Sequence, residues 1–76
     1  MRYRVSISRK EGLSDPEGST TGTALRDLGF DEVASVAFGR TIVLDVADGT
    51  DPGRVDEMCR RLLANPVIED FSVEEL

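Results

Sequence analysis

The chain contains no histidine and only one cysteine, Cys59. Without histidine the commonest general base is absent, and no Ser–His pair can form. A single cysteine cannot make a disulfide within the chain, and a cysteine without histidine argues against a dedicated zinc site. Cys59 falls on the apolar side of a predicted helix. We therefore interpret it as a buried structural thiol rather than a nucleophile, which needs an accessible, electropositive setting. The sequence predicts no catalytic residue and no metal ligand.

Basic charge and long apolar runs are also missing. The formal net charge is -6, which argues against binding to nucleic-acid backbones or to an anionic membrane surface. No apolar run approaches the roughly 20 residues that span a bilayer. The N-terminal stretch MRYRVSIS lacks the apolar segment of a secretory signal. We therefore expect a cytoplasmic protein that binds neither nucleic acid nor membrane.

The composition is that of a folded domain, with 39% hydrophobic and 32% charged residues in a chain of 76. A domain of this length buries only about 60% of the surface that its unfolded chain exposes. Small scaffolds therefore need disulfides, a metal, very good packing or a partner. Since the first two are not indicated, we predict one domain, residues 1–76, that forms a homo-oligomer.

Two helices are predicted, each with an Asp-Pro start. In the first, Asp15 is the expected N-cap, and the helix covers Pro16 to Leu28 before stopping at Gly29. The second follows Asp51-Pro52 and is strongly amphipathic. Its apolar face comprises Val55, Met58, Cys59, Leu62 and Leu63. A proline at position 66 ends this helix.

Four strands are predicted around these helices. Period-two alternation indicates a strand over residues 2–8. Val33–Phe38 and Thr41–Ala47 are β-rich runs separated by Gly39-Arg40, which predicts an antiparallel hairpin. Val67–Val73 is the last strand. The second sheet face is only partly polar, which fits burial against another subunit.

The order β-α-β-β-α-β then defines the fold class. Short right-handed crossovers put both helices on one face of a four-stranded antiparallel sheet. The predicted fold is therefore α+β, a ferredoxin-like two-layer sandwich. Members of this class that bind RNA use aromatic residues on the two central strands. Only Tyr3 is aromatic there, which argues against RNA binding.

Charged residues beside the first helix are the first candidates for a site. The segment EGLSDPEGS contains glycine and precedes a helix, but it lacks the Gly-Lys-Ser/Thr ending of a phosphate-binding loop. Asp15 and Glu17 would also repel a phosphate. They are either solvated charges that suit the helix dipole or an acid/base pair. Arg9, Lys10 and Arg40 are either solvated or contact a partner or an anion.

Glu69 is unusual because strand alternation points it toward the helices with Val67, Phe71 and Val73. Three interpretations remain open. A bulge rotates the side chain outward, the residue lies at the rim of the sheet, or the carboxylate pairs with an arginine of a neighbouring subunit.

The ten residues LLANPVIEDF, 62–71, mix apolar, polar and charged side chains. A match to a family pattern over ten such consecutive positions rarely occurs by chance. Together with Asp15-Pro16-Glu17-Gly18, Ala24-Leu25, Leu28-Gly29-Phe30 and Gly39-Arg40, in that order and spacing, they resemble the PurS family. This family provides the small subunit of phosphoribosylformylglycinamidine (FGAM) synthase. The chain departs from the family pattern in two ways that bear on contacts. Glu17 stands where glutamine is typical, and Ala37 stands where arginine is usual.

The resemblance implies a non-catalytic small subunit in de novo purine biosynthesis. It would bridge a glutaminase subunit and a large synthetase subunit for assembly and ammonia transfer. It implies a dimer or tetramer that holds no cofactor itself, while the complex uses ATP and Mg²⁺. The expected partner-interface residues are Asp15, Glu17, Arg40, Asn65, Glu69 and Asp70.

Two other functions remain open at this point. One is a free-standing ferredoxin-like regulatory domain that binds a small metabolite at a dimer interface. The other is a small ferredoxin-like dimeric enzyme, against which the missing histidine and the apolar setting of Cys59 both count.

Overall fold

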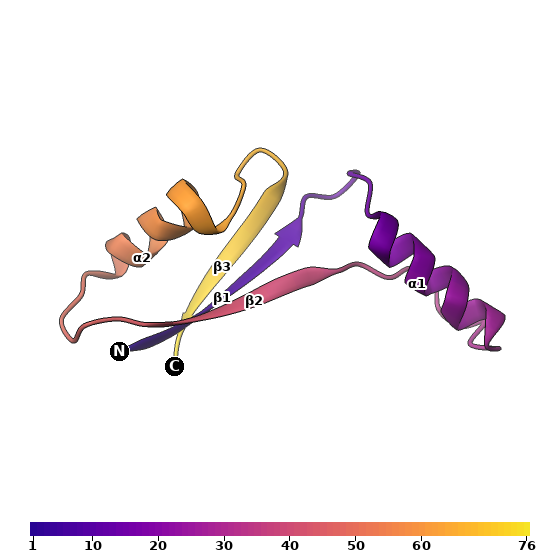
Figure 1. Cartoon of the computed structure of the whole chain (residues 1–76), viewed down its shortest axis with the longest axis horizontal. Coiled ribbons are helices and arrows are strands. Elements are labelled where there is room, and N and C mark those ends of the chain that lie inside the picture. Colours follow the sequence, from indigo (N-terminus) through magenta and orange to yellow (C-terminus); the bar gives the residue numbers. More distant parts are fainter.

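The computed structural model describes all 76 residues and contains three strands and two helices (Figure 1). In chain order the elements are β1 (Arg2–Arg9), α1 (Pro16–Asp27), β2 (Gly39–Asp45), α2 (Pro52–Met58), the π-helical turn η1 (Cys59–Leu63) and β3 (Glu69–Glu75). The predicted α+β class with two helices and an antiparallel sheet is confirmed. Neither helix has the length and apolar character that crossing a membrane requires.

The sheet has the order β2-β1-β3, with both outer strands antiparallel to β1. Val5 in the centre pairs with Ile42 on one side and Val73 on the other. The predicted alternation of β1 is confirmed, because Tyr3, Val5 and Ile7 are buried while the residues between them are exposed. Helix α2 and turn η1 cover this face and contribute Val55 and Cys59 to the core, and Ala64, directly after η1, is also buried there. Cys59 is fully buried, as predicted, and burial raises the pKa of its thiol.

Both helices begin where their Asp-Pro pairs predict. The Asp15 carboxylate accepts a hydrogen bond from the Gly18 N–H at 3.0 Å, and Asp51 accepts one from Gly53 at 2.9 Å. These bonds satisfy donors that the first helical turn leaves without partners. After α1, Gly29 has φ +100°, a left-handed conformation that glycine adopts at low cost.

The end of the second helix differs from the sequence prediction. The Ala64 N–H donates to the Cys59 carbonyl at 2.9 Å, so η1 has the wider turn of a π-helix. This turn rotates Leu62 outward, leaving it 84% exposed, while Leu63 packs against the core. The assignment of Leu62 to the apolar face was therefore wrong, whereas that of Leu63 is confirmed.

The arm, which we define as residues 10–38, also differs from the prediction. Val33–Phe38 forms no strand, and no hairpin turn occurs at Gly39-Arg40, because Gly39 is the first residue of β2. Figure 1 shows the chain running from the far end of α1 back along the helix and into β2 without reversing. Helix α1 lies away from the sheet, so the prediction that both helices cover one face of a four-stranded sheet is wrong for the single chain.

Contacts inside the arm explain why the hairpin stays open. A Cβ on Gly18 would lie 2.2 Å from the Val36 carbonyl oxygen, so only glycine allows this close approach of helix and chain. The Phe38 N–H donates to the second carboxylate oxygen of Asp15 at 2.8 Å. Folding residues 33–38 back onto β2 would break both contacts. The arm is thus a unit in which α1 carries the extended segment 33–38.

Candidate functional site

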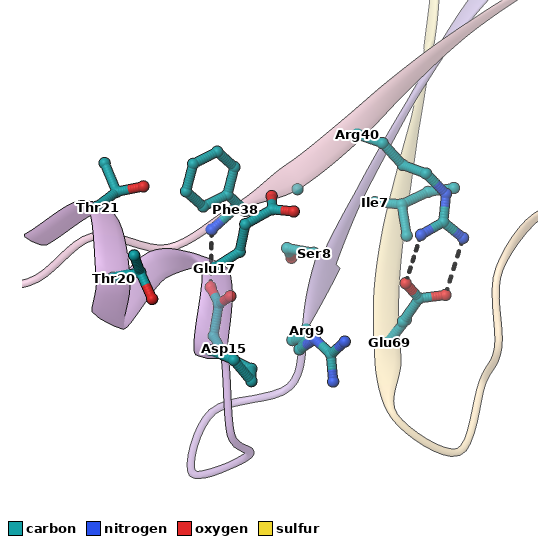
Figure 2. Close-up of a pocket in the computed structure, with 12 residues that line it drawn as sticks. Ile7, Ser8, Arg9, Asp15, Glu17, Thr20, Thr21, Phe38, Arg40 and Glu69 are labelled. Atoms are coloured by element: carbon teal, nitrogen blue, oxygen red, sulfur yellow. Dashed lines mark hydrogen bonds and ion pairs between the residues drawn. The ribbon is translucent and has the colours of Figure 1, made fainter.

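A polar cleft of about 660 Å³ opens where the arm leaves the sheet (Figure 2). Its walls come from the end of β1, the first turns of α1, the start of β2 and the first residue of β3. The charged side chains that line it are Arg9, Asp15, Glu17, Arg40 and Glu69. Four of the six predicted interface residues therefore meet here, from three separate elements of the chain.

Arg40 and Glu69 form the most ordered contact beside the cleft. The Arg40 guanidinium donates to both Glu69 carboxylate oxygens, at 2.6 and 3.0 Å, and to the Leu63 carbonyl at 2.8 Å. Glu69 also accepts a bond from the Asn65 N–H at 2.8 Å. We call these four groups the clasp. Bidentate guanidinium–carboxylate bonds are among the stronger and more directional pairs in proteins, so the clasp fixes the end of η1 against β2 and β3.

Glu69 is the first residue of β3 and lies at the rim of the sheet. Its arginine partner comes from its own chain. The hydrogen bonds from Arg40, followed by the Asn65 N–H, lower the pKa of the Glu69 carboxyl, and the same pair raises the pKa of Arg40. Each charge is therefore matched inside the clasp, and neither side chain is a free group that would polarise a substrate.

Asp15 has a comparable structural task. Its two oxygens accept from Phe38 and Gly18, and these backbone bonds lower the pKa of its carboxyl, with that from Phe38 the larger cause. Asp15 therefore caps α1 and also holds the chain that enters β2. This second role had no signal in the sequence, because the Phe38 N–H lies far away along the chain.

Arg9 and Glu17 are the unmatched charges of the cleft. Both line it, both are exposed, and neither side chain forms a hydrogen bond or an ion pair within the chain. Lys10 is held only through its backbone, whose N–H donates to the Ile68 carbonyl at 2.9 Å and whose carbonyl accepts from the Leu13 N–H at 3.4 Å. Among the cleft residues, Arg9 and Glu17 are therefore the ones available to a partner of opposite charge.

Asn65 organises the turn between η1 and β3. Its side-chain oxygen accepts from the Val67 N–H at 3.1 Å, and its carbonyl accepts from Ile68 and Glu69 at 3.1 and 2.8 Å. Val67 itself stays 78% exposed at the tip of this turn. Sequence reasoning named Asn65 but missed the exposed Val67, which it placed inside the last strand.

Asp70 lies outside the cleft. It lines a shallow groove of about 330 Å³ with small polar residues of the opposite sheet face, including Ser6, Thr41 and Ser72. Of the other five predicted residues only Arg40 lines the same groove. Strand alternation explains the separation, since neighbours on a strand point to opposite faces. The six residues therefore do not form one site. Five surround the cleft and the adjoining turn, and one faces away.

The clasp predicts a particular acid sensitivity. A carboxyl whose pKa is lowered in the folded state stabilises the protein above its unfolded pKa of about 4, and this contribution is lost as the pH falls through the folded value. Glu69→Gln should therefore lower the melting temperature most at pH 7, with a difference from the parent that shrinks toward pH 3. Thermal melts between these pH values test this. Glu32→Gln is the matched control, since Glu32 is exposed and makes no ion pair. A difference that stays constant with pH would contradict the role of the clasp.

No three His, Cys, Asp or Glu side chains gather in a way that would hold a metal ion. The geometry instead defines a class of protein. It is a small α+β protein with an antiparallel sheet and an extended helical arm. Its charged cleft contains the Arg40–Glu69 ion pair, which links β2 to β3.

Comparison with known proteins identifies the family. Residues 2–75 match the family model described as PurS, phosphoribosylformylglycinamidine (FGAM) synthase. The PurS subunit of Archaeoglobus fulgidus is 43% identical over 72 residues, covering 91% of this chain and 90% of that protein. The Bacillus subtilis PurS structure superposes with a TM-score of 0.84 at 40% identity, covering 97% of this chain and 98% of the other. The chain belongs to the PurS family, and the resemblance carried by its motifs is confirmed.

A third similarity concerns a complex. A chain of the PurLQS structure from Thermotoga maritima superposes with a TM-score of 0.84 at 28% identity, covering 99% of this chain and 95% of that one. Subunits of this family form part of FGAM synthase, a ligase (EC 6.3.5.3) of purine biosynthesis. The predicted place of this chain, as a small subunit of that enzyme, is confirmed at the level of the family.

Proposed function

We propose that this chain joins a glutaminase subunit and a large synthetase subunit into a working FGAM synthase, and supports ammonia transfer between them. The observation that carries the proposal is the match along almost the whole chain to a component of the PurLQS structure. Residues 1–76 act as one PurS-like domain in the cytoplasm. The complex, rather than this chain, uses ATP and Mg²⁺.

The cleft and the neighbouring turn support an assembly role. In the clasp, Arg40 and Glu69 neutralise each other within the chain. The clasp therefore holds the turn between η1 and β3 in place rather than binding a ligand. That surface includes the exposed Val67 on the turn, and Arg9 and Glu17 line the cleft beside it. Exposed apolar side chains rimmed by unmatched charges are typical of contacts between subunits. We therefore assign Asn65 and the turn that it organises to contact with the other subunits.

Reconstitution tests this proposal. The chain is mixed with the glutaminase and synthetase subunits of the same organism, formylglycinamide ribonucleotide, ATP and Mg²⁺, and amidine formation is followed with glutamine or with ammonium as the nitrogen source. Omitting the chain should lower the glutamine-dependent rate to the level seen without the glutaminase. The ammonium-dependent rate should remain. An unchanged glutamine-dependent rate would refute the proposal.

A matched pair of variants locates the contact. Val67→Ser changes an exposed side chain on the turn, and Leu76→Ser changes an exposed side chain at the other end of β3. We expect Val67→Ser to raise the concentration of the chain needed for half-maximal glutamine-dependent activity, with Leu76→Ser close to the parent. Equal behaviour of the two variants would remove the turn from the interface.

A further inference from the structure

Strand β3 leaves one side of its backbone unpaired. The sheet has the order β2-β1-β3, so β3 pairs only with β1. At one end of this ladder the Lys10 N–H donates to the Ile68 carbonyl, at 2.9 Å. At the other end the Leu76 N–H donates to the Arg2 carbonyl, also at 2.9 Å. Bonded positions alternate along an antiparallel pair. The even-numbered residues of β3 therefore bond to β1, and the odd-numbered residues point their N–H and C=O groups away from the sheet.

The outward backbone groups of β3 have no partner beyond its first residue. The Glu69 N–H donates to the Asn65 carbonyl at 2.8 Å, within the turn that the clasp fixes. The outward N–H and C=O groups of Phe71, Val73 and Glu75 bond to no other part of the chain. Natural proteins protect such edges with proline, lysine or a bulge. The sequence of β3, EDFSVEE, contains no proline or lysine, and its register with β1 is continuous. The edge is therefore open to another strand.

The charge along this edge is negative. Asp70, Glu74 and Glu75 are exposed, and β3 contains no arginine or lysine. Asp70 and Glu75 form no ion pair, and Glu74 reaches only Arg4, at 3.5 Å between exposed side chains. Exposed pairs of this kind contribute little to stability. We call residues 70–75 the acidic edge, since its carboxylates are largely unmatched within the chain.

The two faces of the sheet present different side chains along the acidic edge. On the face covered by α2, Phe71 packs against the core and Val73 stays 38% exposed. On the other face, Asp70 and Glu74 flank Ser72. Side chains at directly opposed positions of neighbouring strands lie about 4.5–5.5 Å apart at their Cβ atoms. A strand that fits here therefore places apolar residues beside Val73 and basic residues beside the carboxylates.

A second copy of β3 is a poor partner for this edge. Antiparallel pairing of two copies centred on Ser72 would set Asp70 of each strand opposite Glu74 of the other. Like charges directly opposite on neighbouring strands are destabilising. Because β3 has no basic residue, every register of two copies leaves the carboxylates unmatched. Charge complementarity therefore selects a different chain.

We propose that the acidic edge binds an extended segment of another protein chain, in which basic residues alternate with apolar ones. The segment adds to β3 as a further strand and exchanges hydrogen bonds with the outward backbone groups of Phe71, Val73 and Glu75. In this mode of recognition, backbone bonds supply affinity and the alternating side chains supply specificity. The inference rests on the proposed function for the source of the segment, which is the rest of the assembled enzyme.

Amide hydrogen exchange tests the pairing residue by residue. The full chain is compared alone and in the reconstituted complex with the glutaminase and synthetase subunits. Exchange is quenched and measured by mass spectrometry with electron-transfer fragmentation. The amides of Val73 and Glu75 should exchange quickly in the chain alone and about tenfold more slowly in the complex. Ser72 and Glu74, which bond to β1, are internal controls and should be protected in both states.

A charge reversal tests the chemistry of the segment. Glu75→Lys should raise the concentration of the chain needed for half-maximal glutamine-dependent activity by about tenfold, because like charges would then meet. Glu32→Lys is the matched control, since Glu32 is exposed and makes no ion pair, and it should behave like the parent. Added salt should weaken assembly of the parent more than that of Glu75→Lys.

Glutamine-dependent activity separates failure of this proposal from failure of the proposed function. Fast exchange of Val73 and Glu75 in an active complex would show that the acidic edge stays uncovered, while the proposed function would stand. If no complex forms, both are refuted. Slow exchange of the same amides in the chain alone would show that a second copy covers β3. Equal behaviour of Glu75→Lys and Glu32→Lys would show that the segment is not basic.

Discussion

Replacing Gly18 with alanine is expected to destabilise the protein, whereas the same substitution at Gly22, one helical turn further on, is expected to stabilise it. In an α-helix, alanine is better than glycine by about 0.5–1 kcal/mol. At Gly22 the new methyl group meets only the flexible Arg26 side chain and a Val36 methyl, at 3.4 Å or more. The intrinsic preference of the helix should therefore prevail at that position.

At Gly18 the close approach reverses the sign. A Cβ there would lie 2.2 Å from the Val36 carbonyl oxygen, which is backbone and cannot rotate away. Segment 33–38 would have to leave the helix, and overpacking of this kind costs about 1–3 kcal/mol. Chemical denaturation at one fixed protein concentration gives both values. If the two variants shift stability in the same direction, the packing of helix and segment described here is incorrect.

The second large effect concerns two adjacent leucines. Leu63→Ala should lower the free energy of unfolding by about 2 kcal/mol, the lower end of the range for truncating a buried leucine, because Leu63 is only partly buried against the core. Leu62→Ala should change it by less than about 0.5 kcal/mol, because an exposed side chain loses little on truncation. The two variants remove the same side chain at adjacent positions of η1, so each serves as the control of the other.

This comparison tests the π-helical turn directly. In a regular α-helix both leucines would contribute to the apolar face, and both variants would be destabilised. Urea denaturation of the two proteins distinguishes the cases, since a similar loss for both would show that η1 is an ordinary α-helical turn. A truncation at Leu62 that left stability unchanged but weakened self-association would place that side chain at a subunit contact.

The local parts of this structure follow from the sequence. The alternation of β1, the two Asp-Pro helix starts, the glycine after α1 and the buried Cys59 each depend on neighbours within a few residues. Their physical causes are side-chain period, capping and backbone conformation. These causes act within a segment and do not depend on its contacts with distant parts of the chain.

The hairpin and the clasp depend on contacts between distant segments. Gly39-Arg40 has the composition of a turn, but the contacts of Val36 and Phe38 with α1 favour a straight course. The sequence leaves three interpretations of Glu69 open, namely a bulge, the rim of the sheet and an arginine of a neighbouring subunit. Nothing local indicates that Arg40 of the same chain reaches it across β1. The π-helical turn also escaped prediction, since its sequence has the same apolar spacing as an α-helix.

The exposed apolar residues of the arm make the stability of this subunit depend on its concentration. Where association with another subunit supplies the surface that α1 lacks, the stability of the folded state follows mass action. A tenfold dilution then removes about 1.4 kcal/mol of stability per dimer, a large part of what a small domain possesses. Melting temperatures should therefore rise with protein concentration. At low concentration the subunit should unfold before the supply of subunit limits assembly of the enzyme.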